Sequence, residues 1–177
     1  RNHPGSVLRS DFVPRYLASL DDRLGLIAGL GIDFTVPITF DDDLSQLRAS
    51  EFVALLKDML KMRAMVIGPD FSMGYRREAD AKMLAALGEE MGFPVVVVDP
   101  FTDEHGNPIR STTIRELLAI GDVIHVSTLM GRYFPLSGTV IEGSGLGGTL
   151  GFPTANLQVP ETMAVPGNGI YTTWAEV

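Results

Sequence analysis

The chain has 177 residues, of which 45% are hydrophobic and 20% are charged, enough for one sizeable globular domain and part of another. Acidic residues number 22 against 14 basic ones, and the net charge of −8 argues against an extended nucleic-acid surface. The absence of cysteine excludes disulfides, thiolate metal sites and cysteine catalysis, and it fits a reducing cytosol. No apolar run reaches the length of a membrane span and no signal peptide is visible, so we expect neither a membrane nor nucleic acid as a partner.

The first part of the chain alternates helical and strand-like segments. Apolar residues recur at helical spacing over residues 17–30, with Ser19 and Asp22 placed for a capping box. Residues 32–40 read as a strand, in which Pro37 implies a bulge or a lost ladder bond. A helix capped near Ser50, a strand buried on both faces, a helix and a further strand are then predicted over residues 52–60, 64–68, 77–91 and 93–98. This alternation predicts an α/β fold with a parallel sheet.

The character of the chain changes in its last third. Turn residues predict a loop over residues 102–108. A helix that ends near Ile120 and a short helix over residues 123–130 are predicted after it. Beyond Gly131, short alternating strands separated by Gly and Pro replace the helical pattern. We therefore expect two domains, residues 1–131 and 132–177. Because the chain begins without Met and stops in a strand-like run, we expect both domains to be incomplete.

Two loops of the first domain carry candidate binding residues. In an open parallel sheet, ligands bind at the carboxyl ends of the strands. The loop Gly68–Gly74 leaves such an end and offers the Asp70 carboxylate and the flat Phe71 ring, although the same pattern is often a simple turn with a packed Phe. Ser111 and Thr112 lie at a helix N-terminus with Arg115 one turn inside, which suits an anion; an ordinary helix cap with a solvated Arg is the alternative.

A glycine-rich stretch in the second domain has the composition of a phosphate and metal loop. Glycines without Cβ let backbone N–H groups approach a polyphosphate and reach positive φ at little cost. Pro153 favours an extended backbone, in which the Thr154 hydroxyl and the Asn156 amide face the same way. Hard oxygens on one face suit Mg²⁺. A glycine-rich hairpin whose Thr and Asn satisfy local backbone groups is the alternative. The glycines are Gly143, Gly145, Gly147, Gly148 and Gly151.

The segment Gly151-Phe-Pro-Thr-Ala-Asn156 resembles the signature of the riboflavin kinase module of bacterial bifunctional riboflavin kinase/FMN adenylyltransferases, also called FAD synthetases. The resemblance implies a small antiparallel β-barrel, framed by residues 131–140 and 169–171. It also implies that Thr154 and Asn156 bind Mg²⁺, and that they bind ATP together with Gly143, Gly145, Gly147 and Gly151. One departure is Gly148, where that family usually has a basic residue.

The two loops of the first domain, in this order before the kinase signature, resemble the FMN adenylyltransferase module of the same family. The resemblance implies a Rossmann-like nucleotidyltransferase sheet with helices on both faces. It assigns the catalytic and ATP-phosphate contacts to Ser111, Thr112 and Arg115, and the flavin contacts to His3, Pro4, Asp70 and Phe71. Met73 and Arg110 depart from the family pattern. The family's His-x-Gly-His segment and the Glu base of its kinase are expected outside the residues given.

By this resemblance, the parent protein phosphorylates riboflavin to FMN and transfers AMP from ATP to FMN, which yields FAD and pyrophosphate. ATP, riboflavin, FMN and FAD are then its substrates or products, Mg²⁺ its cofactor and the cytoplasm its location, and a weak homo-oligomer is left open. A non-catalytic flavin or nucleotide binder, an inactive fragment and another nucleotidyltransferase are the alternatives. We expect the 177 residues made alone to fold poorly and to catalyse neither step.

Overall fold

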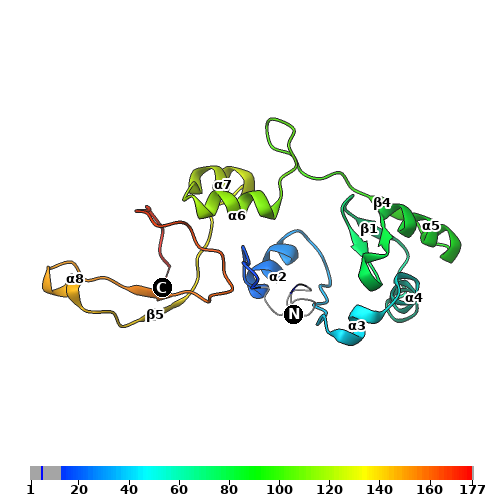
Figure 1. The fold of residues 1–177 in the computed structure, drawn as a ribbon, viewed down its shortest axis with the longest axis horizontal. Coiled ribbons are helices and arrows are strands. Elements are labelled where there is room, and N and C mark those ends of the chain that lie inside the picture. Colours follow the sequence, from blue (N-terminus) through cyan, green and yellow to red (C-terminus); the bar gives the residue numbers. More distant parts are fainter. Residues whose placement is uncertain (1–4, 6–12, 177) are drawn as a thin grey trace. The chain divides into compact units, whose positions relative to one another are not determined.

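The computed structural model describes residue 5 and residues 13–176 (Figure 1). These residues form two compact units. The first unit is described at Gly5 and over Pro37–Pro108, and the second unit is described over Val13–Val36 and residues 109–176. Among the described residues, no helix combines the length and the apolar character needed to cross a membrane.

The first unit is built around a parallel pair of strands. Strand β1 (Met65–Ile67) pairs with β4 (Val95–Val97) in parallel, and helix α5 (Ala81–Met91) lies between them in the sequence (Figure 1). The parallel α/β arrangement expected from the sequence is thereby confirmed. Five shorter or flanking elements complete this unit: α3 (Asp42–Gln46), α4 (Ala49–Leu60), β2 (Ser72–Met73), the 3₁₀ turn η1 (Tyr75–Arg77) and β3 (Ala79–Asp80), the two short strands being antiparallel.

Helices α4 and α5 pack on one face of this pair. Met65 and Ile67 are buried in one cluster with Val53 of α4 and Leu84 of α5. Val66, which points to the opposite face, is 66% exposed. The prediction that residues 64–68 are buried on both faces is therefore wrong. Among the described residues, side chains cover one face of the β1–β4 pair and leave Val66 on the other face exposed.

The start of α4 is fixed by two carboxylates. The helix was expected to be capped near Ser50, but Arg48 occupies the N-cap position. The Arg48 backbone N–H donates to Glu51 at 2.7 Å, and the Ala49 N–H donates to Glu78 at 2.9 Å. The Ala49 N–H, followed by the Arg48 guanidinium, holds the pKa of Glu78 below its usual value. Charge from the β2–β3 region thus replaces the hydroxyl cap that the sequence suggested.

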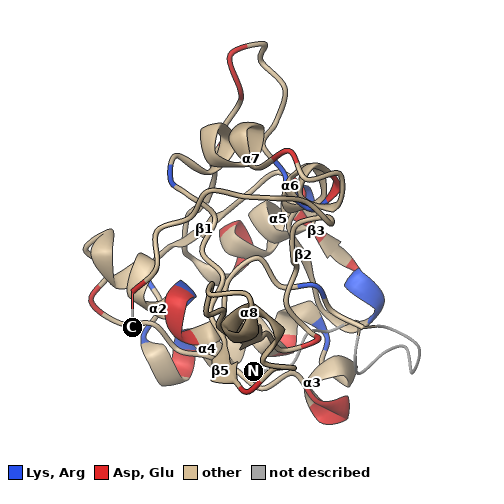
Figure 2. Ribbon diagram, turned by 90° about the vertical axis from the view of Figure 1, so that its left-hand side faces the viewer, with Lys and Arg blue, Asp and Glu red and all other residues tan. Residues whose placement is uncertain are grey.

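The second unit begins with the helix that the sequence predicted best. Helix α2 (Leu20–Gly29) starts at Ser19, whose hydroxyl accepts from the Asp22 N–H at 3.0 Å while the Asp22 carboxylate accepts from the Ser19 N–H at 3.2 Å. This reciprocal pair is the predicted capping box. The first turn is acidic, as the red segment of α2 in Figure 2 shows, which suits the positive end of the helix dipole.

Residues 32–40 do not form the predicted strand. They are irregular in the structure, and Phe34 is 88% exposed. A strand is stabilised by a hydrogen-bonded neighbour, and no described strand pairs with this segment. Pro37 also lacks the N–H that a ladder bond needs.

Helices α6 (Ser111–Ala119) and α7 (Val123–Met130) form the core of the second unit. Leu118 and Val126 are fully buried between them, next to Ala164. Backbone hydrogen bonds tie distant segments to this core: Tyr16 donates to the Thr162 carbonyl at 2.8 Å and its own carbonyl accepts from Ala164 at 2.8 Å. The packing of this unit therefore depends on contacts between residues far apart in the sequence.

The remainder of the second unit carries a hairpin. Strand β5 (Thr139–Ile141) pairs with β6 (Asn156–Gln158) in antiparallel fashion, and the single turn α8 (Leu146–Thr149) lies in the loop that joins them (Figure 1). The strands of the described residues do not close into a barrel, so the structure contains the antiparallel start of the expected architecture. The expected domain boundary near Arg132 stays a prediction, because α6 and α7 pack in the same unit as this hairpin.

Candidate functional site

The glycine-rich hairpin loop borders an open pocket of about 310 Å³. The residues that line it come from the end of β5, the loop and the start of β6, namely Val140, Ile141, Glu142, Gly143, Gly145, Gly148, Pro153, Thr154, Ala155 and Asn156. Four predicted site residues, Gly143, Gly145, Thr154 and Asn156, therefore meet at one place. Gly147 and Gly151 belong to the loop but are not part of this lining.

Two of the glycines in this loop lie directly against the two predicted metal ligands. A Cβ built on Gly143 would lie 1.8 Å from the Asn156 amide nitrogen, and one built on Gly147 would lie 2.9 Å from the Thr154 hydroxyl oxygen. Both separations are shorter than a van der Waals contact, the first by far. The two side chains thus occupy space that only glycine leaves open.

Other glycines of the loop serve its turns. Gly145 has φ +71° and Gly151 has φ +82°, both in the left-handed region that favours glycine. Directly after Gly151, the Phe152 N–H donates to the Gly147 carbonyl at 2.8 Å and ends the short α8 turn. The positive φ expected from the sequence is confirmed at these two positions.

Thr154 and Asn156 are exposed, and neither side chain makes a hydrogen bond to the part of the chain that the structure describes. A hairpin that used these side chains to satisfy its own backbone would show such bonds. This arrangement favours the interpretation that their oxygens serve a ligand from solution.

The donors around this pocket suit Mg²⁺ held together with a nucleotide. Thr154, Asn156 and Glu142 offer hard oxygens, whereas no group of three or more His, Cys, Asp or Glu side chains that could hold a metal alone occurs among the described residues. Mg²⁺ usually takes one or two protein ligands and fills the rest of its shell with phosphate and water. The lining contains one acid and no base, so a bound triphosphate would need a cation to neutralise its charge.

The second candidate group lies at the N-terminus of α6. Arg115 donates from Nε to the Arg15 carbonyl at 2.6 Å and from Nη1 to the Ser111 hydroxyl at 3.2 Å. Ser111 and Thr112 are exposed, and the Arg110 side chain forms no capping bond. The structure thus brings Ser111 and Arg115 into contact, while the lining of the hairpin pocket does not include them.

The third candidate group lies in the first unit, in the turn after β1. The Phe71 N–H donates to the Gly68 carbonyl at 3.1 Å, which closes the turn, and the Phe71 side chain is 40% exposed. Asp70 is exposed in the same turn. Both residues follow the carboxyl end of a parallel strand, where the sequence placed them. His3 and Pro4 lie outside the described residues.

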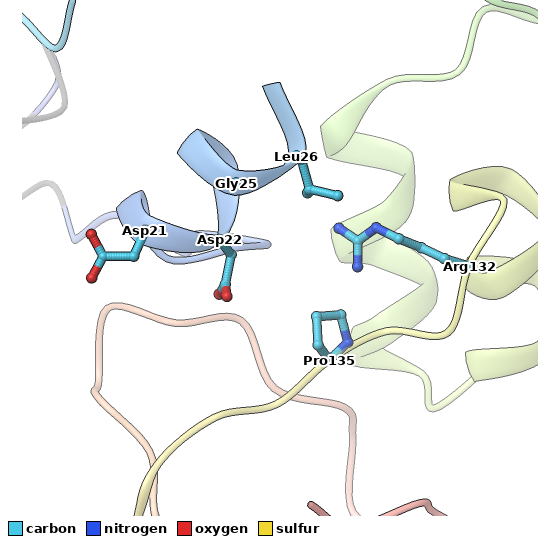
Figure 3. Close-up of a pocket in the computed structure, with 6 residues that line it drawn as sticks. All are labelled: Asp21, Asp22, Gly25, Leu26, Arg132 and Pro135. Carbon is cyan, nitrogen blue, oxygen red and sulfur yellow. The ribbon is translucent and has the colours of Figure 1, made fainter. Parts of the chain in front are cut away.

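A further hollow, of about 370 Å³, was not predicted from the sequence (Figure 3). It is lined by Asp21, Asp22, Gly25 and Leu26 of α2 and by Arg132 and Pro135. The Ser19 hydroxyl is the main cause that lowers the pKa of Asp22, and the Arg132 charge adds a smaller effect. Because Asp22 is already used as a helix cap, the sequence offered no signal for a second role.

Comparison with known proteins decides the family. The family model described as FAD synthetase matches residues 1–113, which is more than half of the chain. The chain belongs to the FAD synthetase family. A second family model, described as riboflavin kinase, matches residues 130–177 of the chain.

Individual relatives agree with the family models. The chain is 34% identical over 169 residues to the bifunctional riboflavin kinase/FMN adenylyltransferase of Escherichia coli strain K12, covering 95% of the chain and 53% of the relative. It is 32% identical to the enzyme of the same name from Bacillus subtilis strain 168, covering 99% of the chain and 55% of the relative. The chain thus spans about half the length of the curated relatives it matches. The resemblance inferred from the sequence motifs is confirmed.

A solved structure shares the fold. A crystal structure described as a macrolide-efflux protein from Streptococcus pneumoniae superposes with a TM-score of 0.81 at 27% sequence identity, covering 94% of this chain and 54% of that one. The hairpin residues lie within the riboflavin kinase match, and Asp70, Phe71, Ser111 and Thr112 lie within the FAD synthetase match. Arg115 lies just beyond the FAD synthetase match, so its predicted role depends on its position in α6 and its contact with Ser111.

Proposed function

We propose that this chain is the central part of an enzyme that makes FMN from riboflavin and FAD from FMN, with ATP as the donor in both steps. The observation that carries the proposal is the meeting of Thr154 and Asn156 in one glycine-lined pocket, within the segment that matches riboflavin kinase. Small flavins and nucleotides are then its partners, and we propose a cytoplasmic location.

In the kinase step, a riboflavin hydroxyl attacks the γ-phosphorus of ATP, a new P–O bond forms and the β–γ bridge bond breaks to release ADP. Phosphoryl transfer of this kind depends on positioning and charge neutralisation more than on covalent help from the protein. We propose that Thr154 and Asn156 orient Mg²⁺ and the terminal phosphates, while Gly143, Gly145, Gly147 and Gly151 let the loop backbone approach them. Bound Mg²⁺ would supply the positive charge that the pocket lining lacks.

In the adenylyl step, a phosphate oxygen of FMN attacks the α-phosphorus of ATP and pyrophosphate leaves. We propose that Ser111, Thr112 and Arg115 bind the ATP phosphates at the positive end of α6. The remaining proposed contacts are to the flavin, from Asp70 and Phe71 in the turn after β1 and from His3 and Pro4.

The test of this proposal uses the full-length gene product and measures both steps separately. Asn156→Ala should lower FMN formation from riboflavin by at least about tenfold, because a misplaced metal and phosphate cost rate steeply. FAD formation from supplied FMN should stay near wild type. Gln158→Ala is the matched control, because Gln158 is exposed on the same strand β6 and lies outside the pocket lining.

The same experiment separates the alternatives. Unchanged FMN formation by Asn156→Ala would remove Asn156 from the kinase site and overturn the assignment. A wild-type protein that binds flavin and ATP but forms neither FMN nor FAD would favour a non-catalytic binder. The match to riboflavin kinase over residues 130–177 argues against an unrelated nucleotidyltransferase.

A further inference from the structure

Gly143 is surrounded in an unusual way. The three heavy atoms nearest to a Cβ at this position all belong to the Asn156 side chain: Nδ2 at 1.8 Å, Cγ at 2.9 Å and Oδ1 at 3.4 Å. Gly143 is also absent from the described glycines with positive φ. Other residues can adopt the backbone conformation of Gly143, so a requirement for glycine here is steric. It comes from the Asn156 side chain, which occupies the space that a Cβ would need.

We infer that Gly143 is a positioning residue for Asn156. The missing Cβ lets the Asn156 carboxamide lie across the hairpin with its nitrogen against Gly143 and its oxygen farther away. This inference rests on the proposed function, in which the Asn156 oxygen serves Mg²⁺ and ATP. It gives Gly143 a role different from the approach of its backbone N–H to phosphate.

Gly147 shows why Gly143 is the informative position. A Cβ on Gly147 would lie 2.4 Å from the Phe152 carbonyl oxygen, so a larger residue there must move the loop backbone. For a Cβ on Gly143, the three nearest heavy atoms all belong to the Asn156 side chain, which can rotate. The strand pairing next to it, Ile141 opposite Asn156, involves backbone atoms that the methyl group does not reach first. Gly143→Ala should therefore leave the hairpin folded and turn the carboxamide away.

Gly143→Ala should weaken ligand binding as much as Asn156→Ala, which removes the carboxamide. In the full-length gene product carrying Arg115→Ala, which weakens the second proposed ATP site at α6, Gly143→Ala and Asn156→Ala should each weaken binding of Mn²⁺·ATP at the hairpin pocket by about tenfold to a hundredfold. Electron paramagnetic resonance without turnover measures this binding. The KM for Mg·ATP in FMN formation should rise by a similar factor, while the KM for riboflavin stays within about twofold. The double variant should be no worse than either single variant, because both act through one group.

Two structural readouts accompany the binding measurement. In wild-type protein, a nuclear Overhauser effect should connect the Asn156 side-chain amide protons with the Gly143 α-protons, and Gly143→Ala should shift the amide signal. Gly148→Ala should leave that signal in place, because nothing lies within 4 Å of a Cβ on Gly148. Gly25→Ala in α2 is the control for the activity measurements, since that position is equally open.

Each outcome decides something. If Asn156→Ala leaves Mn²⁺·ATP binding at the hairpin pocket unchanged, the proposed role of Asn156 in the kinase site fails, and the inference about Gly143 fails with it. If Asn156→Ala weakens binding and Gly143→Ala does not, or if their effects multiply in the double variant, only the inference is overturned. Should Gly143→Ala unfold the protein, the double variant with Asn156→Ala should recover the stability of Asn156→Ala, since the clash is then gone; continued unfolding would also refute it.

Discussion

Replacing Gly88 by Ala tests the packing of the first unit against a helix preference that acts in the opposite direction. Gly88 is buried in α5, and a Cβ there would lie 2.7 Å from the Phe93 carbonyl oxygen and 2.8 Å from Cγ2 of Val95. Alanine favours a helix interior over glycine by about 1 kcal/mol. Forcing an extra methyl group into a packed core costs roughly 1–3 kcal/mol. Gly88→Ala should therefore be neutral or destabilise the unit by up to about 2 kcal/mol.

Gly25→Ala supplies the matched comparison. Gly25 is an exposed residue inside α2, and nothing lies within 4 Å of a Cβ there. The same substitution should stabilise α2 by about 1 kcal/mol. Because the helix preference is common to both changes, the difference between their free energies isolates the steric effect at Gly88, about 1–3 kcal/mol.

Native-state hydrogen exchange of the full-length gene product, read on peptides from α5 and α2, measures the two effects locally. The expected result is unchanged or faster exchange in α5 of Gly88→Ala and slower exchange in α2 of Gly25→Ala. Equal protection gains in the two helices would refute the close contact between Gly88 and the segment that carries Phe93 and Val95.

Three further changes follow from contacts described above. Arg115→Ala should slow FMN adenylylation by about tenfold to a hundredfold and spare riboflavin phosphorylation; steady-state rates of both steps check this, and equal losses would show that its bond to the Arg15 carbonyl is structural. The His125 ring lies 2.5 Å from the Asp122 carboxylate, and its hydrogen bond is the main cause that lowers the pKa of Asp122. The stability that this ionised carboxylate contributes is therefore complete above 3.8, the ordinary pKa of Asp, and is lost as the pH falls through the lowered pKa. Hydrogen exchange in α7 should therefore distinguish Asp122→Asn from wild type at neutral pH, and the difference should shrink on acidification below pH 3.8. Arg76 has φ +53°, so Arg76→Gly should relieve backbone strain and stabilise the first unit by about 0.5–1 kcal/mol in thermal unfolding, whereas a loss of stability would contradict the strain.

Local signals predicted local structure well. The capping box of α2 depends on Ser19 and Asp22, three residues apart, and it forms as the sequence indicated. The turn after β1 and the positive φ of Gly145 likewise depend on neighbours in the chain. Residues 32–40 failed because a strand needs a partner as well as a pattern, and none is present among the described strands.

Features set by distant residues could not be predicted. The α4 start uses Glu78, which lies 29 residues after Ala49, so inspection of the sequence near Ser50 pointed to the wrong cap. The exposure of Val66 depends on what covers each face of the β1–β4 pair, which a short apolar run does not reveal. The composition of the glycine-rich loop predicted its turns, but the proximity of Gly143 to Asn156 depends on how the hairpin brings together two residues that are 13 positions apart.

The hydrogen bonds of Tyr16 to Thr162 and Ala164 determine the order in which the two units can fold during synthesis. These partners are about 150 residues apart, and at roughly 5–20 residues per second the ribosome needs on the order of ten seconds to make the later one. Residues 37–108 of the first unit lie between these partners in the sequence, so the first unit can be completed during that delay. Until Thr162 and Ala164 are synthesised, the segment around Tyr16 lacks these partners and can be bound by chaperones. Slower translation lengthens this interval, so expression yield should depend on codon choice between residues 37 and 164.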